Sequence, residues 1–244
     1  MPESPLRNKA VLITGASRRV GRTLALASAE AGADVIIQYR TSRDLAESTR
    51  KEVESMGRGA WILRADLRKP DAVPRLAEQA FKLAPVFGLV NSAAIFAGSP
   101  LWETSPEDWE THLAINLTAP FLLLQAFTRL RGTEREGRLV NLLVWPALRT
   151  GTGSFFLHGH QGCPSRHDVI VGAIDAPHIS VNGPALGAFL PPQDEEPNPE
   201  IVSRIPARRW GEPSEAGAIL VYLLARPAYL TGEIIHVDGG RHLL

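Results

Sequence analysis

Short apolar runs alternate with helical patterns along the whole chain. Buried strands are expected at 10–14, 34–39, 60–64, 87–91, 138–143, 179–182 and 233–237. Amphipathic or capped helical patterns are expected at 19–31, 44–56, from about 70, at 106–130 and at 213–224. Continuous apolar strands separated by helices are typical of a parallel sheet that is covered on both faces. The pattern therefore predicts one doubly wound α/β domain of about seven strands over residues 1–244.

Composition adds mainly exclusions. Lys+Arg and Asp+Glu balance at 26 each, so net charge gives no reason to expect nucleic acid or a membrane surface as a partner. No apolar run approaches the roughly 18 residues needed to span a bilayer, and the polar N-terminus does not resemble a signal peptide. The single cysteine, Cys163, excludes an internal disulfide framework. These features predict a soluble cytoplasmic protein.

A glycine-containing loop joins the first predicted strand to the first helix, and reads Thr14-Gly15-Ala16-Ser17-Arg18-Arg19-Val20-Gly21. Glycine there lets the backbone approach a pyrophosphate, and the helix N-terminus supplies N–H groups and a positive dipole. Asp66 and Leu67 follow the third strand, where a carboxylate can reach an adenine amine. Small residues after the fourth strand leave room for a ribose. The predicted dinucleotide contacts are therefore Gly15, Ser17, Arg18, Arg19, Val20, Gly21, Asp66, Leu67, Asn91, Ser92 and Ala93.

The end of the second strand bears on the choice between NAD and NADP. An acidic residue there would bind the ribose 2′-hydroxyl of NAD, whereas this chain has no carboxylate before Asp44. Guanidinium and hydroxyl donors suit a 2′-phosphate instead. The alternative is that the arginines are solvated surface residues. Two groups of residues are expected at the same corner of the cofactor site, namely the loop cations Arg18 and Arg19 and the residues Tyr39, Arg40, Thr41 and Ser42. Together they favour NADP(H).

With these features the chain resembles the short-chain dehydrogenase/reductases over nearly all of its length. The loop TGASRRVG and the QYRTS sequence after the second strand resemble the pteridine reductase branch. Asn116 in AINLTAPF matches the family's helix asparagine, which holds a water in a proton relay. Thr231-Gly232 and Val237-Asp238-Gly239-Gly240 match its C-terminal strand. Leu186-Gly187 stands where the family has Pro-Gly, which adds Gly187 to the cofactor residues.

The resemblance implies a Rossmann-type fold, NADP(H) as cofactor and hydride transfer to a carbonyl or ring imine. It also implies a homotetramer or homodimer and a small-molecule substrate, for which a planar heterocycle such as a pterin is one candidate. Phe96 and Trp145 are the candidate pocket residues. The proline-rich stretch within 188–204 is expected to form a mobile flap.

The family's catalytic side chains are missing from the matching positions. The family uses a tyrosine as proton donor, a lysine four residues later, and a serine or aspartate thirteen residues before the tyrosine. Counted without gaps, these positions are Leu157, Gln161 and Val144. The surrounding segment, residues 150–176, also lacks a helical pattern. It contains Pro164 and several glycines where the family has a long helix.

A compensated pair of frameshifts offers an explanation for this segment. Permitted codons for LHGHQGCPSRHD, read one base later, give Tyr-Thr-Val-Thr-Lys-Ala-Ala-Leu-His-Gly-Met-Thr. The tyrosine then falls at position 157 and the lysine at 161. Because each residue permits several codons, this translation shows only that the sequence is compatible with a frameshift. Val144 lies outside the shifted segment.

Two other hypotheses take the chain as written. In the first, the protein is a non-catalytic dinucleotide binder that has lost its active-site residues. In the second, the segment 150–176 binds a metal through His158, His160, Cys163 and His167. These residue types suit zinc, although their spacing fits no closed zinc site.

Overall fold

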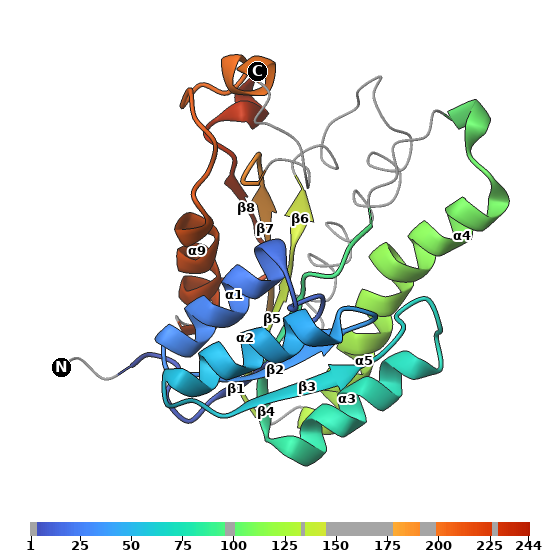
Figure 1. Cartoon of the computed structure of the whole chain (residues 1–244), viewed down its shortest axis with the longest axis vertical. Helices are drawn as coiled ribbons and strands as arrows, with labels where there is room; N and C mark the ends of the chain where they lie inside the picture. The colour runs from blue at the N-terminus through green and yellow to red at the C-terminus, as the bar shows by residue number, and fades with distance from the viewer. Residues whose placement is uncertain (1–3, 96–100, 133–134, 145–177, 191–198, 226–228) are drawn as a thin grey trace.

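The computed structural model describes residues 4–95, 101–132, 135–144, 178–190, 199–225 and 229–244 (Figure 1). The strands are β1 (Ala10–Ile13), β2 (Asp34–Tyr39), β3 (Ala60–Arg64), β4 (Val86–Asn91), β5 (Gly137–Asn141), β6 (Leu143–Val144), β7 (Ile179–Leu186) and β8 (Ile234–Val237). The α-helices are α1 (Arg19–Glu30), α2 (Arg43–Ser55), α3 (Ala72–Leu83), α4 (Pro106–Leu113), α5 (Ala119–Arg131), α8 (Pro199–Ser203) and α9 (Pro213–Ala225).

One parallel sheet carries the fold. Its order is β3-β2-β1-β4-β5-β7, with β8 paired to the other side of β7. β6 continues the path of β5 after Leu142 and also pairs with β7, through Leu143↔Ala185 and Val144↔Leu186. The sheet therefore has seven strand paths, and the predicted doubly wound α/β fold is confirmed.

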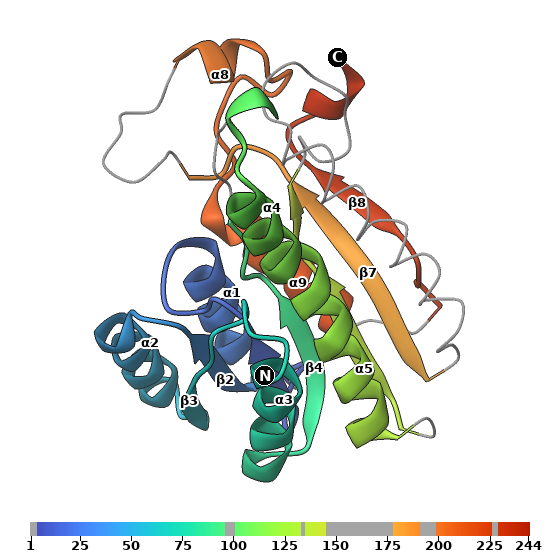
Figure 2. The same cartoon turned by 90° about the vertical axis from the view of Figure 1, so that its right-hand side faces the viewer.

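Helices cover both faces of this sheet, and alternate residues of the strands reach opposite layers. Val11 and Ile13 of β1 pack into a core with α1, α2 and α9. Leu12, between them, packs into a second core with α3 and α5. These two helices lie on the same face of the sheet (Figure 2). Because both faces of β1 are buried, the strand is apolar throughout, which is why it was readable from sequence.

β7 is longer than predicted. The predicted strand ends at Asn182 and is followed by Gly183 and Pro184, two residues that are common in turns. In the structure both belong to the strand and pair with β8. On the other side, β5 pairs as far as Asn182 and β6 begins opposite Ala185, so Pro184 lies in the gap between the two ladders. A proline is tolerated there because no N–H is required of it on that side.

The helix predicted over 106–130 is interrupted by a π-helical turn, η2 (Ala114–Thr118). Pro120 explains the interruption, because it has no N–H to donate to the carbonyl of Asn116 four residues earlier. The N–H of Ala119 accordingly bonds to Ala114 O, five residues back. Single π turns are frequent at functional sites, and Asn116 lies in the middle of this one.

The starts of two helices can be compared with the predictions in detail, and one of them differs. α3 begins at Ala72 rather than near Pro70, which lies in the preceding turn. α4 begins at Pro106, as predicted, and has Ser105 as its N-cap, with the Ser105 hydroxyl accepting from Asp108 N at 3.1 Å. The Asp108 carboxylate accepts from that hydroxyl at 2.6 Å.

The helical run Pro106–Arg131 is long and apolar enough to cross a membrane by length and composition. The sequence-based expectation that no segment of the chain reaches this length is therefore wrong. A core helix passes the same test. The buried residues of α5 are those of a helix packed on a sheet, namely Ala119, Leu123, Ala126 and Phe127.

Candidate functional site

A cavity of about 550 Å³ lies at the carboxyl ends of β1, β2, β3 and β4. The chain order reverses between β1 and β4, because β2 and β3 lie on one side of β1 and β4 lies on the other. Ligands of open α/β sheets bind at such switch points. Fifteen of the sixteen predicted cofactor residues line this cavity, namely Gly15, Ser17, Arg18, Arg19, Val20, Gly21, Tyr39, Arg40, Thr41, Ser42, Asp66, Leu67, Ser92, Ala93 and Gly187.

The hydroxyl of Thr14 holds two residues of the cavity wall, Ser92 and Ala93, in place. Its oxygen accepts hydrogen bonds from Ser92 N and Ala93 N, both at 3.0 Å, and donates to Val90 O at 3.4 Å. Thr14 is almost fully buried. One side chain therefore joins the end of β1 to the loop after β4, which are the two segments on either side of the switch point.

Glycine is required at two places in the loop. Gly15 has a φ of +65°, and a Cβ on it would lie 3.0 Å from Ala93 Cα. A Cβ on Gly21 would lie only 2.3 Å from Gly15 O, closer than van der Waals contact allows. Gly21 therefore lets the first turn of α1 approach the end of β1, and Gly15 lets the loop after β4 approach it, which leaves a backbone-lined cradle open to the cavity.

Gln38 was not predicted as a site residue, yet it connects three parts of the cavity wall. Its Oε1 accepts from Gly15 N at 2.9 Å and its Nε2 donates to Ala65 O at 2.8 Å. The side chain is 2% exposed. A fully buried polar residue that follows the apolar run Val35–Ile37 of β2 is the signal that could have identified it.

Replacing Gln38 by leucine is expected to lower the free energy of unfolding by about 2–4 kcal/mol, because Gly15 N and Ala65 O each lose a partner. The affinity for NADPH is expected to fall about tenfold, because Gly15 is then no longer held in place. Urea denaturation and NADPH fluorescence titration measure the two effects. The matched control is Gln125→Leu on the exposed side of α5. Equal results for both variants would contradict a positioning role for Gln38.

The rim of the cavity is positively charged. Arg18, Arg19 and Arg40 are exposed and line it. α1 has no side-chain cap and no acidic residue in its first turn, so nothing in that turn neutralises the positive end of its dipole. Among the described residues that line the cavity, Asp66 is the only acidic one. These charges favour an anionic ligand.

The Asp66 carboxylate is engaged by Arg68. The Nη2 of Arg68 donates to it at 2.6 Å and its Nε donates at 2.9 Å. The pKa of Asp66 is lowered to about 2, mainly by the Arg68 side chain, with a smaller contribution from Arg40. Its predicted contact with an adenine amine stays a prediction, and in the structure Arg68 holds this carboxylate in place.

Asn91, the remaining predicted cofactor residue, lies beside the large cavity rather than in its wall. It lines a separate cavity of about 20 Å³ together with Asn116 and Asn141. Its Nδ2 donates to Asn141 Oδ1 at 2.7 Å. The amide of Asn116 makes two bonds to the backbone of Ile95, donating to its O at 3.0 Å and accepting from its N at 3.1 Å. Asn116 therefore anchors the loop after β4 to η2.

The catalytic positions are only partly visible. Val144 is the last residue of β6 and pairs with Leu186, next to the large cavity. Leu157, Gln161, Phe96 and Trp145 lie outside the described residues, as do the candidate metal ligands of the segment 150–176. Sequence reasoning missed several apolar residues of the cavity wall, namely Ile95, Ile115, Leu142, Leu143, Leu186, Phe189 and Leu190.

The sequence profile of the short chain dehydrogenase family matches residues 9–148, which is more than half of the chain. The protein belongs to the short-chain dehydrogenase family. The match covers the glycine loop, the strands β1 to β6 and the asparagine of η2. It ends two residues before the segment 150–176.

Individual relatives extend the match to nearly the whole chain. The 3-oxoacyl-[acyl-carrier-protein] reductase of Synechocystis sp. is 29% identical over 240 residues, covering 96% of this chain and 97% of the relative. The structure of FolM alternative dihydrofolate reductase 1 from Brucella canis, complexed with NADP, is similar with a TM-score of 0.90 and 28% identity. It covers 98% of this chain and 96% of that one.

A blue fluorescent protein from a metagenomic library, in complex with NADPH, is similar with a TM-score of 0.90 and 29% identity. The alignment covers 97% of this chain and 99% of that one. The sequence-based resemblance to short-chain dehydrogenases is therefore confirmed, and with it membership in a family of oxidoreductases that act on small molecules.

Proposed function

We propose that this short-chain dehydrogenase binds NADP(H) and is built for hydride transfer to a carbonyl or a ring imine, nearest to the pteridine reductases. The positively charged rim carries the proposal. Arg18, Arg19 and Arg40 line one cavity with Thr41 and Ser42, and Asp66 beside them is already paired with Arg68. Similar structures that contain NADP or NADPH support the same cofactor.

The cavity fits a dinucleotide by the shape of its backbone as well as by its charge. A Cβ on Gly15 or Gly21 would fill the cradle at the start of α1. In the proposal, this cradle holds the pyrophosphate, with the N–H groups of the first turn of α1 as donors. Arg40, Thr41 and Ser42 hold the 2′-phosphate. When bound, NADPH supplies the hydride for reduction.

The proposed substrate is a small molecule, and a planar heterocycle suits the apolar part of the wall. Ile95, Leu143, Leu186 and Phe189 contribute apolar surface to the cavity wall. The name of the Brucella canis protein, an alternative dihydrofolate reductase, supports a pterin-type ring. The name of the Synechocystis relative contains a 3-oxoacyl substrate instead, so a 3-oxoacyl thioester is the competing substrate class.

A second candidate function is a dinucleotide binder without catalysis. The observation that favours it is the set of residues at the family's catalytic positions, Val144, Leu157 and Gln161, none of which can donate a proton to the product. Binding of NADPH without any turnover, in a protein shown by peptide mapping to carry the written sequence, would support this function.

The assembly and the compartment are proposed from the family resemblance. We infer a homotetramer or homodimer in the cytoplasm. Light scattering coupled to size-exclusion chromatography tests the assembly, and a monomer at micromolar concentration would contradict it.

Arg40→Ala is expected to raise the dissociation constant for NADPH by about 10- to 100-fold, because a charge-assisted contact to phosphate contributes about 1.5–3 kcal/mol. The dissociation constant for NADH, which has no 2′-phosphate, is expected to change less than twofold. Fluorescence titration with each cofactor measures both. Arg75→Ala, an exposed arginine on α3, is the matched control. Parallel losses for NADPH and NADH would contradict the assignment of Arg40 to the 2′-phosphate.

A further inference from the structure

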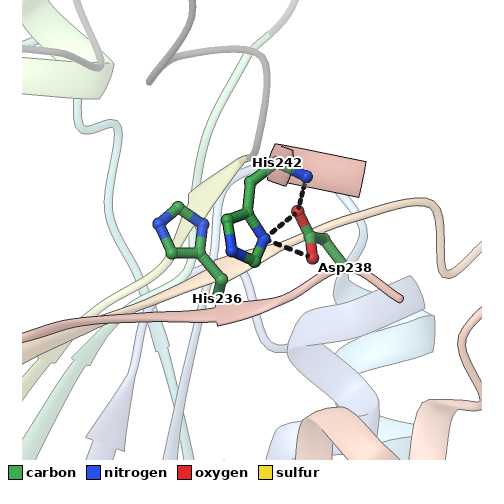
Figure 3. Close-up of side chains that lie close together, drawn as sticks. All are labelled: His236, Asp238 and His242. Carbon is green, nitrogen blue, oxygen red and sulfur yellow. Dashed lines mark hydrogen bonds and ion pairs between the residues drawn. The ribbon is translucent and has the colours of Figure 1, made fainter. Parts of the chain in front are cut away.

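Two histidines and an aspartate gather near the C-terminus; none of the three lines the cofactor cavity, although Asp238 lies against Gly187, which does. His236 lies on β8, and Asp238 follows this strand directly. His242 lies on the 3-10 turn η4 (Arg241–Leu243) (Figure 3). One ligand atom from each of the three side chains lies within 4.8 Å of the others.

Asp238 holds His242 in one orientation. The Asp238 carboxylate accepts from His242 N at 2.7 Å and from Gly240 N at 3.0 Å, and it contacts His242 Nδ1 at 3.0 Å. The Asp238 side chain is only 1% exposed. Because a carboxylate accepts hydrogen bonds, the proton of a neutral His242 ring is on Nδ1, which leaves the lone pair of Nε2 available. Histidines that bind metals commonly have such a carboxylate on the other ring nitrogen.

His236 is the exposed member of the group. Its ring stacks on that of His242 with 4.0 Å between the centroids and 15° between the planes. Among the described residues, its ring nitrogens make no hydrogen bond.

We propose that His236 and His242 form a binding site for a divalent transition metal of the zinc class, with Asp238 orienting His242 from behind. Two imidazole nitrogens on one tetrahedral zinc ion are about 3.3 Å apart, from Zn–N distances of about 2.0–2.1 Å. The stacked rings do not yet direct both lone pairs at one point. The exposed ring of His236 turns out of the stack to complete the site, while Asp238 keeps His242 fixed. Water fills the remaining positions.

The donor set selects the class of metal. Imidazole nitrogen suits zinc, copper and nickel, whereas magnesium and calcium prefer oxygen ligands. Asp238 already accepts three hydrogen bonds, so it acts as the orienting carboxylate rather than as a ligand. Its buried negative charge also offsets part of the charge of the metal. The proposal needs no cofactor, and it stands whether or not the chain is an active reductase.

Calorimetric titration of the tag-free full chain with ZnCl₂ tests the site. Binding of one zinc ion is expected, and His236→Gln and His242→Gln are each expected to raise its dissociation constant at least about tenfold. The double variant is expected to bind zinc no more weakly than either single variant, because the one histidine that remains in a single variant cannot chelate the ion. Crystals soaked in ZnCl₂ are expected to show anomalous scattering between the two rings.

Two controls make the result specific. His178→Gln removes a histidine elsewhere in the chain and is expected to leave the affinity unchanged. A variant in which His158, His160, Cys163 and His167 are all replaced separates this site from the segment 150–176. Zinc affinity that follows those four residues, or that stays within twofold in both His236→Gln and His242→Gln, would overturn the proposal. His236 is exposed, so its variant is expected to fold normally, as thermal unfolding checks.

Discussion

Replacing Leu157–Asp168 with Tyr-Thr-Val-Thr-Lys-Ala-Ala-Leu-His-Gly-Met-Thr is expected to raise NADPH-dependent reduction by about 10²- to 10⁴-fold. That range is the contribution that a positioned general acid makes to a proton transfer. In the family pattern, the tyrosine is the proton donor and the lysine four residues later lowers its pKa. Oxidation of NADPH is followed at 340 nm with dihydrofolate and, separately, with a 3-oxoacyl thioester.

The control for this replacement is the same twelve residues with phenylalanine in place of the tyrosine. It restores the apolar pattern of the segment but not the acid, so it separates catalysis from folding. A rate equal to that of the written chain in the tyrosine version, with NADPH still bound, would refute the frameshift explanation for the missing catalytic side chains. Peptide mapping of the natively produced protein over 145–180 shows directly which sequence the cell makes.

Gly21→Ala is expected to lower the free energy of unfolding by about 2–4 kcal/mol and to weaken NADPH binding at least 100-fold. Alanine normally favours a helix over glycine by about 1 kcal/mol. Here the added Cβ would lie 2.3 Å from Gly15 O, so backbone atoms on both sides of the cradle must move. The overpacking therefore outweighs the helix propensity. Urea denaturation and fluorescence titration measure the two losses.

Thr23→Ala is the matched control on the same helix. It removes a single long hydrogen bond, from the hydroxyl to Arg19 O at 3.4 Å, and it is expected to change stability by less than about 0.5 kcal/mol. If Gly21→Ala were as stable as the parent and bound NADPH within threefold, the close approach of α1 to the end of β1 would be wrong.

Much of the sheet was predictable from sequence because strands such as β1 and β4 are buried on both faces and are therefore mostly apolar. β2 and β3 agree with the prediction at both ends. The π turn was not predicted, since the helical pattern continues without a break through 106–130. The relevant signal was Pro120, whose missing N–H affects a residue four positions earlier. The predicted end of β7 was also too early, before Gly183 and Pro184. A single sequence cannot show that β5 and β6 leave Pro184 without a hydrogen-bonding partner strand on one side.

The rim of the candidate site was also predictable, because its residues directly follow strands. Arg40 and Asp66 come just after β2 and β3, and the carboxyl ends of parallel strands meet at one edge. Gln38 and Phe189 were missed for a different reason. Their part in the cavity depends on which strands are neighbours and in which register, and a single sequence does not contain that information. The catalytic segment was questioned from sequence alone, and it lies outside the described residues.

Arg19 has a φ of +51°, in the left-handed region that favours glycine. A residue with a Cβ held there costs about 1 kcal/mol relative to glycine. Natural selection removes such a cost easily, by a substitution to glycine, unless the side chain contributes something else. Here the side chain adds a cation to the rim of the cavity. The loop thus shows a trade-off between stability and function, and a lineage that no longer used a dinucleotide would be expected to lose this arginine through neutral drift.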